Sequence, residues 1–281
     1  MTRPYRSVLY IPASKQRALE KARALAADAI IFDLEDAVAP EEKDAARETL
    51  ARFLAEVDYG PRARIVRING FDTPWGQADA AAFGRMAGVD ALLVPKVDGV
   101  AVLDAVAALT DKPLWAMMET ARGMLNAAAI AAHPRLEGMV MGTNDLAKEI
   151  GSRFRADRLG VMAGLGHCLL AARAEGRVIV DGVYNSFKDD EGLRAECVQG
   201  RDMGFDGKTL IHPAQLDVAN AVFAPSQDEV ALARRQIAAF AEARASGQGV
   251  AVLDGKIVEN LHVAGAEAVL ARAEAIAALA E

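Results

Sequence analysis

The chain alternates between short, nearly continuous apolar stretches and longer stretches in which alanine mixes with charged residues. The apolar stretches are SVLYIP (7–12), AIIFDLED (29–36), RIVRIN (64–69), ALLVPK (91–96), LWAMME (114–119), GMVMG (138–142), VIVDG (178–182) and GKTLIHP (207–213). Apolar runs without strict alternation are typical of strands covered on both faces, as in a parallel sheet. The pattern therefore predicts eight buried parallel strands.

Helices are predicted between these strands. The predicted segments are 15–25, 41–55, 75–87, 99–109, 122–132, 145–150 with the residues that follow, 190–203 and 214–223. The GLG stretch at 164–166 is expected in a loop. Eight repeats of strand and helix predict a (β/α)8 TIM barrel, an α/β fold, over residues 1–224. A doubly wound open sheet is the alternative, but it usually has a glycine-rich turn after its first strand, and IPASKQ contains no glycine.

Residues 225–281 lie beyond the eight repeats and form a predicted C-terminal extension. Ser226 and Glu229 have the spacing of a capping box that starts a helix, and Gly247 and Gly249 end it. An extended segment with a turn follows, and then a last helix from about residue 264. A barrel does not need this extension, so we expect it to pack on the barrel, on a neighbouring subunit, or on both.

Composition limits the classes of partner. The net charge of −7 argues against nucleic acid, and the longest apolar runs are too short to span a membrane. The two cysteines form no disulfide framework and no metal-binding motif. The first residues enter a strand without the apolar region of a secretion signal. These features indicate a cytoplasmic enzyme or binding protein.

Polar residues end several of the apolar runs, and in a TIM barrel the carboxyl ends of the strands carry the active site. The candidates are Tyr10, Asp33, Glu35, Asp36, Arg67, Asn69, Lys96, Glu119, Asn144, Asp145, Asp181 and His212. Glu119 and Asp145 close consecutive strands, and adjacent strands lie about 4.8 Å apart. Two oxygen ligands without a matching His or Cys favour Mg²⁺, for which Mn²⁺ can substitute. Arg67 is suited to grip a substrate carboxylate.

Several of these candidates also have a purely structural interpretation. Asp145 could cap the helix that starts with DLAKEIG. Arg67 could pair with Glu35 or Asp36, and His212, which precedes Pro213, could order its loop. Glu119 is harder to explain structurally, because a carboxylate is costly to bury without a cation or a hydrogen-bond donor.

The linked motifs RSVLYIPASKQRALEKA, IIFDLEDAV, VRIN, VPKV, METARGMLN, GTNDLAKEIG, DGKTLIHPAQ and DGKIVEN resemble the citrate lyase β-subunit-like family. That family includes malyl-CoA, β-methylmalyl-CoA and citramalyl-CoA lyases. The resemblance covers nearly the whole chain and implies a TIM barrel whose C-terminal extension reaches a neighbouring subunit, commonly in trimers or multiples of them. WAMMETARGMLNAA, VMGTNDLAKE and DGKIVENLH are most similar to members that hydrolyse (3S)-malyl-CoA to malate and free CoA.

The resemblance also implies roles for individual residues. Glu119 and Asp145 match the family's Mg²⁺ ligands, and Arg67 matches the arginine that holds the acyl carboxylate. The residues expected to contact substrate or CoA are Tyr10, Lys15, Lys21, Asn144, Asp145, Ile211 and His212. Glu35 and Asp36 would steady Arg67 and the waters of the metal.

One position departs from the lyase pattern. Lyases of this family usually carry aspartate in a tail motif of the form GKMID, donated to the neighbour's active site, whereas this chain reads GKIVE with Glu259. A longer acid displaces a proton-transfer group, which weakens the case for carbon–carbon cleavage. The resemblance thus implies a thioesterase in which Glu259 acts as base or nucleophile. The alternatives are a lyase, a citrate lyase subunit that uses an acyl-carrier protein, and an inactive CoA-thioester-binding protein.

Overall fold

The computed structural model describes residues 3–279, which divide into two compact units. The barrel unit is Tyr5–Ala221, and the tail unit combines the residues before Tyr5 with those from Val222 onward. No helix within the described residues combines the length and the apolar character that crossing a bilayer requires.

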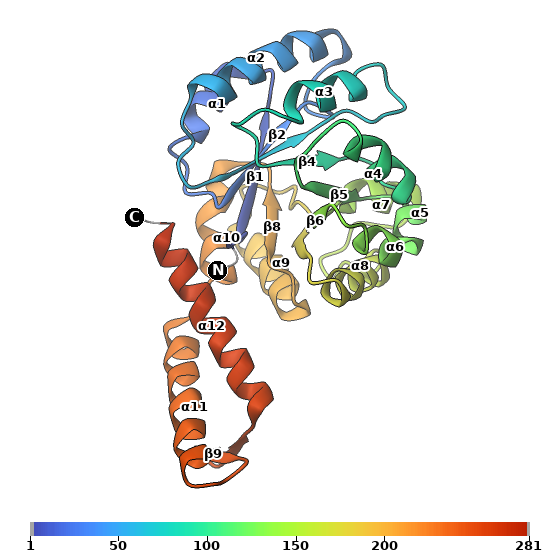
Figure 1. Ribbon diagram of the computed structural model, residues 1–281. Coiled ribbons are helices and arrows are strands. Elements are labelled where there is room, and N and C mark those ends of the chain that lie inside the picture. The colour runs from blue at the N-terminus through green and yellow to red at the C-terminus, as the bar shows by residue number, and fades with distance from the viewer. Residues whose placement is uncertain (1–2, 280–281) are drawn as a thin grey trace. The chain divides into compact units, whose positions relative to one another are not determined.

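Eight parallel strands close into a barrel in chain order, which confirms the predicted (β/α)8 fold (Figure 1). The strands are β1 Ser7–Pro12, β2 Ala29–Asp33, β3 Ala63–Arg67, β4 Ala91–Val94, β5 Leu114–Met118, β6 Leu136–Met141, β7 Val178–Asp181 and β8 Gly207–Leu210. Each pairs with the next, and β8 returns to pair with β1. Because the polar residues follow the last apolar residue of each run, they lie at or just past the strand ends.

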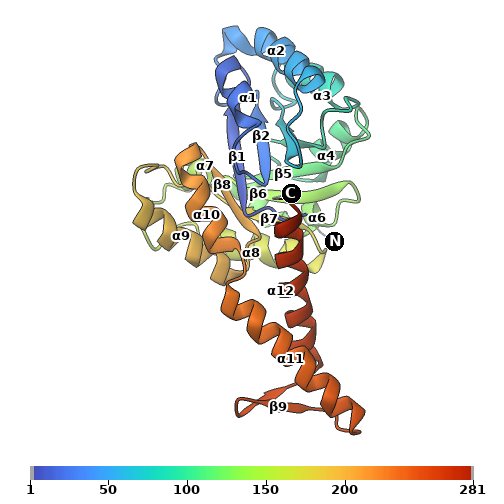
Figure 2. The same ribbon diagram turned by 90° about the vertical axis from the view of Figure 1, so that its left-hand side faces the viewer.

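The helices of this unit lie around the outside of the strands (Figures 1 and 2). They are α1 Gln16–Ala22, α2 Lys43–Glu56, α3 Gly76–Phe83, α4 Val100–Ala107, α5 Ala121–Leu125, α6 Ala127–Ala131, α7 Thr143–Glu149, α8 Met162–Ala174 and α9 Asp190–Met203. Short 3₁₀ turns occur at Pro40–Glu42 and Pro213–Gln215, and α10, Leu216–Phe223, crosses the boundary between the units.

The prediction of a loop at residues 164–166 was wrong, because these residues lie inside α8. A β-carbon on Gly164 would stand only 3.1 Å from the sulfur of Met124 and 3.2 Å from Leu146. The glycine therefore permits close helix packing and does not break the helix. In the same region, the predicted helix 122–132 is divided at Asn126 into α5 and α6.

Side chains that alternate along the strands fill the inside of the barrel. The apolar cluster there draws on β1 to β7 and includes Trp115 and Met117 of β5 and Val140 of β6. Trp115 is fully buried and lies opposite Gly138 in the β5–β6 register. A β-carbon at Gly138 would come within 2.6 Å of the indole ring, so the glycine makes room for the tryptophan.

The tail unit contains two long helices and a hairpin. Ser226 and Glu229 exchange the two hydrogen bonds of the predicted capping box at the start of α11, Gln227–Ala245. The strands β9, Ala251–Leu253, and β10, Lys256–Val258, form an antiparallel hairpin. Its two-residue turn, Asp254–Gly255, has φ of 50° and 75°, as a tight hairpin turn requires. Helix α12, Asn260–Ala278, begins four residues before its predicted start at 264.

Replacing Gly138 by alanine is expected to destabilise the barrel by about 1–3 kcal/mol, because the added methyl group overpacks the site against Trp115. The measurement is the urea midpoint followed by tryptophan fluorescence, since Trp75 and Trp115 both belong to the barrel unit. Gly166→Ala is the matched control. This position in α8 has open space around it, so alanine should leave stability unchanged or raise it by about 0.5–1 kcal/mol. Equal midpoints for the two variants would contradict the packing argument.

Candidate active site

On several strands, the inward-facing position that follows the apolar core toward the carboxyl end carries a charged side chain. Successive inward positions on β2 are Ala29, Ile31 and Asp33, and on β3 they lead to Arg67. The same alternation beyond Met117 brings Glu119 inward at the end of β5. The mouth of the barrel is thus closed by a layer of charged groups.

Arg67 lies at the centre of this layer and is 5% exposed. Its Nε and Nη2 donate to the two oxygens of Asp33 at 2.7 and 2.6 Å, a side-on bidentate pair across the β2–β3 register. Nη1 lies 2.7 Å from Glu35 and 3.2 Å from Asp36. The ring of Tyr10 lies over the guanidinium, 5.1 Å away. The pairing of Arg67 with Glu35 and Asp36 that the sequence analysis considered is therefore present, but its main partner is Asp33.

Burial and the neighbouring charges act in opposite directions on the pKa values of these groups. Burial opposes the charged form of Arg67, but the neighbouring groups, Asp33 first among them, together outweigh it and hold the pKa of the guanidinium well above its usual value. Burial raises the pKa of Glu35 even though Arg67 and Lys96 oppose the shift. Burial also raises the pKa of Tyr10, whose hydroxyl lies 3.5 Å from the sulfur of Met117.

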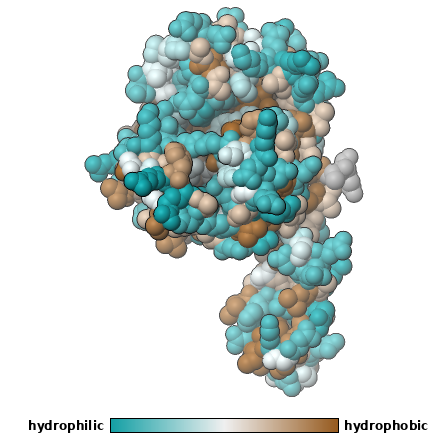
Figure 3. All heavy atoms as spheres, turned by 180° about the vertical axis from the view of Figure 1, so that it is seen from behind, coloured by the Kyte–Doolittle hydropathy of each residue, from teal (hydrophilic) through white to brown (hydrophobic). Residues whose placement is uncertain are grey.

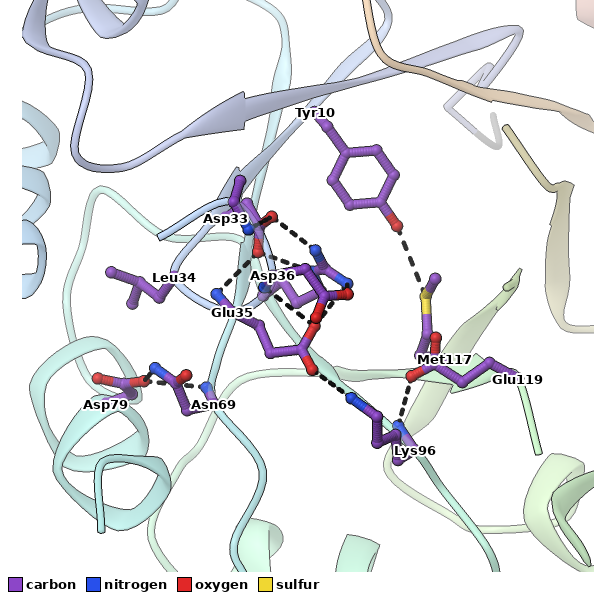
Figure 4. A network of polar contacts seen from close by, with 12 residues as sticks. Tyr10, Asp33, Leu34, Glu35, Asp36, Asn69, Asp79, Lys96, Met117 and Glu119 are labelled. Carbon is purple, nitrogen blue, oxygen red and sulfur yellow. Dashed lines mark hydrogen bonds and ion pairs between the residues drawn. The ribbon is translucent and has the colours of Figure 1, made fainter. Parts of the chain in front are cut away.

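Lys96, just past β4, joins two acids of the layer (Figure 4). Its backbone N–H donates to Glu119 at 2.8 Å, and its Nζ donates to Glu35 at 2.6 Å. Glu119 is 2% exposed, and burial raises the pKa of its carboxyl to about 7 despite that backbone hydrogen bond. Glu119 thus lacks a full counter-charge among the described residues.

A cavity of about 390 Å³ opens above this layer. Its lining residues are Tyr10, Pro12, Asp33, Asp36, Ala37, Arg67, Met117, Glu119, Met141, Gly142, Thr143, Asn144, Asp145, Val183 and Ile211. Glu119 and Asp145, which come from the ends of β5 and β6, therefore face one cavity. The backbone continues this pairing past the strands, since the N–H of Gly142 donates to the carbonyl of Met118 at 2.8 Å.

The structure does not support Asp145 as a helix cap. Helix α7 begins at Thr143, and its cap residue is Gly142, for which no side-chain cap hydrogen bond is found. Asp145 lies in the first turn of α7, where a carboxylate is favoured by the helix dipole. It is one of the residues that line the cavity.

Some of the other candidate residues line the cavity, and one does not. Ile211 and Asn144 line it, and the side chain of Asn144 exchanges two hydrogen bonds with Asn185. His212 lies outside the lining. Its Nδ1 accepts from the backbone N–H of Ala214, which is the loop-ordering role considered from the sequence.

The two lysines expected to contact CoA belong to the first helix. Lys15 directly precedes α1 and Lys21 lies in its last turn, and both are exposed. Glu259 belongs to the tail unit, where it is exposed at the start of α12 and its backbone N–H donates to Nδ1 of His262.

Sequence reasoning underestimated Asp33 and Lys96. Both were recognised as polar residues at strand ends, yet neither was assigned a role. The register that pairs Asp33 with Arg67 is a property of the folded barrel. The signal for Lys96 was its position after the apolar run ALLVP, which is the same signal that identified Glu119.

The residues present fit a Mg²⁺ ion. Glu119 is a buried carboxylate that faces the cavity together with Asp145. A β-carbon on Gly142 would come within 2.7 Å of Oε2 of Glu119, so the glycine leaves that oxygen its space. Within residues 3–279 no group of three or more His, Cys, Asp or Glu is arranged to hold a metal. Mg²⁺ commonly binds to only one or two protein carboxylates and keeps its other coordination positions for water and substrate, so two carboxylates are enough for this ion.

Comparison with known proteins gives a consistent result. Residues 6–213 match the family described as HpcH/HpaI aldolase/citrate lyase. A (3S)-malyl-CoA thioesterase from Cereibacter sphaeroides is 73% identical over 98% of this chain and 96% of its own. An L-malyl-CoA/β-methylmalyl-CoA lyase from the same species is 35% identical, with coverage of 98% and 96%.

Among solved structures, the protein CitE from Mycobacterium tuberculosis, in complex with magnesium, acetoacetate and coenzyme A, is similar with a TM-score of 0.80. It is 34% identical in sequence, and the match covers 96% of this chain and 98% of that one.

Replacing Asp33 by asparagine is expected to destabilise the barrel by about 3–5 kcal/mol, because it leaves the buried guanidinium of Arg67 without its bidentate partner. The measurement is again the urea midpoint by tryptophan fluorescence. Asp36→Asn is the control, since Asp36 pairs with the same arginine but has a side chain that is 61% exposed. Its loss should cost at most about 1 kcal/mol. If the two variants unfolded together, Asp33 would not be the anchor of the layer.

Proposed function

The chain belongs to the HpcH/HpaI aldolase/citrate lyase family, and on that premise we propose that it hydrolyses (3S)-malyl-CoA to malate and free CoA in a Mg²⁺-dependent reaction. The observation that carries the proposal is the identity of 73% over nearly the full length to a (3S)-malyl-CoA thioesterase, against 35% to a lyase of the same family. The intact charged layer supports catalysis over a role in binding alone.

Glu119 and Asp145 would hold the metal ion. Bound there, Mg²⁺ supplies a Lewis acid for the oxygens of the hydroxy-acid end of the substrate. Arg67 holds positive charge at the same cavity. Its bidentate edge is occupied by Asp33, so a substrate carboxylate reaches it by replacing Asp36, whose contact is the longest and most exposed of the four. Lys15 and Lys21 offer exposed positive charge for the phosphates of CoA.

The hydrolytic step needs a group that acts on water or on the thioester carbonyl. We assign this to Glu259 of a neighbouring subunit. As a base, its carboxylate takes a proton from water while the water oxygen bonds to the carbonyl carbon. The carbon–sulfur bond then breaks, and the proton passes to the departing thiolate of CoA. As a nucleophile, the carboxylate would form a transient anhydride that water opens.

The surface around Glu259 suits burial against a second copy. Val252 and Ile257 face each other across the β9–β10 hairpin and are 69% and 60% exposed, and Leu261 is 67% exposed. Figure 3 shows apolar residues at the surface of the tail unit. Exposed apolar groups gathered in this way mark interaction surfaces. We therefore propose a homo-oligomer, a trimer or a multiple of it, in the cytoplasm.

A lyase remains the second candidate, because the lyase relative is similar over the whole chain and the proposed metal ligands serve either reaction. Its products separate it from a hydrolase.

Incubation of the purified protein with (3S)-malyl-CoA and Mg²⁺ is expected to release malate and free thiol. Thiol release is followed with a chromogenic reagent and the acids by chromatography. Chelation with EDTA should abolish turnover, and Glu119→Gln should lose at least about 10²-fold, as expected when a ligand of a catalytic ion is removed. Formation of glyoxylate and acetyl-CoA would establish the lyase. Turnover without added carrier protein would exclude a requirement for an acyl-carrier partner.

Glu259→Gln is expected to lower kcat by about 10²–10⁴-fold, the usual contribution of a general base, and to leave substrate affinity largely unchanged. Glu267→Gln, an exposed glutamate on the same helix α12, is the matched control and should retain full activity. Calorimetric titration with a non-hydrolysable malyl-CoA analogue separates binding from chemistry. A normal kcat in Glu259→Gln would remove Glu259 from the mechanism.

A further inference from the structure

Lys96 adopts a backbone conformation that residues with a β-carbon rarely occupy. Its φ is 49°, in the left-handed region. Among the described residues other than glycine, Arg158 and Asp254 share a positive φ. Asp254 belongs to the tight turn of the β9–β10 hairpin, which demands this geometry. Lys96 instead follows a parallel strand at the barrel mouth, and strain at such a place indicates a functional constraint.

The two ends of Lys96 make different contacts as a result. The backbone N–H donates to Oε1 of Glu119 at 2.8 Å, and the side-chain Nζ donates to Oε1 of Glu35 at 2.6 Å. Oε2 of Glu35 in turn lies 2.7 Å from Nη1 of Arg67. One residue therefore links the acid at the end of β5 to the arginine at the end of β3.

We propose that Lys96 is a positioning residue that orients Glu119 for the metal ion and fixes its placement relative to Arg67. This inference rests on the proposed magnesium site. Because the Lys96 N–H occupies Oε1 of Glu119, Oε2 is left for the ion, and this oxygen packs against Gly142, which has no side chain to displace it. Because the ammonium group is tied to Glu35, the loop after β4 is held in the conformation that aims this N–H. Lys96 itself is absent from the lining of the reaction cavity.

A stabilising ion pair is the competing explanation for the Lys96–Glu35 contact. The side chain of Lys96 is 51% exposed, and pairs of this kind contribute little to stability. The two explanations predict different measurements. A stabilising pair affects the melting temperature, whereas a positioning residue affects the affinity for the ion in the free protein.

The test is isothermal titration of the full-length, metal-free protein with Mg²⁺ in the absence of substrate. Lys96→Met, which removes the ammonium group and keeps the aliphatic stem, is expected to weaken Mg²⁺ binding by about 10–100-fold, as loss of a group that supports a metal ligand does. Lys96→Arg should recover most of the affinity. Lys112→Met is the matched control. It removes the same charge at the opposite end of the barrel, just before β5, and should bind Mg²⁺ like the wild type.

Thermal unfolding of the metal-free variants accompanies the titration, and the melting temperature of Lys96→Met should stay within a few degrees of the wild type. If Lys96→Met fails to fold, Lys96→Gln, which removes the charge and whose side chain ends one atom short of the ammonium that contacts Glu35, takes its place with the same expected direction. If the wild type binds Mg²⁺ and the variant binds it with the same affinity, the positioning role of Lys96 is overturned and the proposed metal site stands. A wild type that binds no Mg²⁺ overturns the proposed metal site as well.

Discussion

The buried pair of Arg67 with Asp33 is the interaction on which the barrel mouth depends. A guanidinium inside a barrel must be neutralised by groups of good geometry, and Asp33 provides two hydrogen bonds across adjacent strands. Glu35, Asp36 and Lys96 then complete a network around that pair. Acidic groups outnumber cationic ones in the region, and Glu119 is the buried acid with the weakest compensation. The surplus of negative charge is what makes a divalent cation the expected ligand.

Glycines shape the space that the charged layer faces. Gly142 follows β6 and Gly182 follows β7, at the level where β2, β3 and β5 carry Asp33, Arg67 and Glu119. A β-carbon at Gly142 would collide with Glu119, and one at Gly182 would collide with Thr143. The mouth is therefore charged on one side and short of side chains on the other. The two glycines let Glu119 and Thr143 pack closely against the backbone after β6 and β7, and Glu119, Gly142 and Thr143 all line the cavity.

The sequence predicted the parts of this site that depend on pattern alone. Apolar runs located all eight strands, and the polar residue after each run identified Glu119 and Arg67. The pairing of Asp33 with Arg67 depends on which residues the β2–β3 register sets side by side, and single strands do not encode that. The left-handed backbone conformation of Lys96 could not be predicted either, because lysine rarely adopts it. Likewise, GLG suggested a loop because glycine favours one locally, but packing against Met124 decided in favour of a helix.

The barrel mouth is suited to both reactions of the family. On the proposed function, either one needs a cation held by carboxylates and an arginine near a substrate carboxylate, and the residues proposed for both roles, Glu119, Asp145 and Arg67, belong to the barrel unit. We infer that the choice between them is made by the group that meets the thioester, which we propose is Glu259, the residue between β10 and α12. A carbon–carbon cleavage requires a proton delivered to one carbon atom of an enolate, so the acid must be placed within hydrogen-bond reach of it. Attack on a thioester carbonyl by water tolerates a carboxylate at a different distance, because the water between the carboxylate and the carbonyl can adjust its position. On this proposal, a glutamate at position 259 in place of aspartate would change the reaction by moving one carboxylate, while the proposed metal ligands Glu119 and Asp145 stay the same.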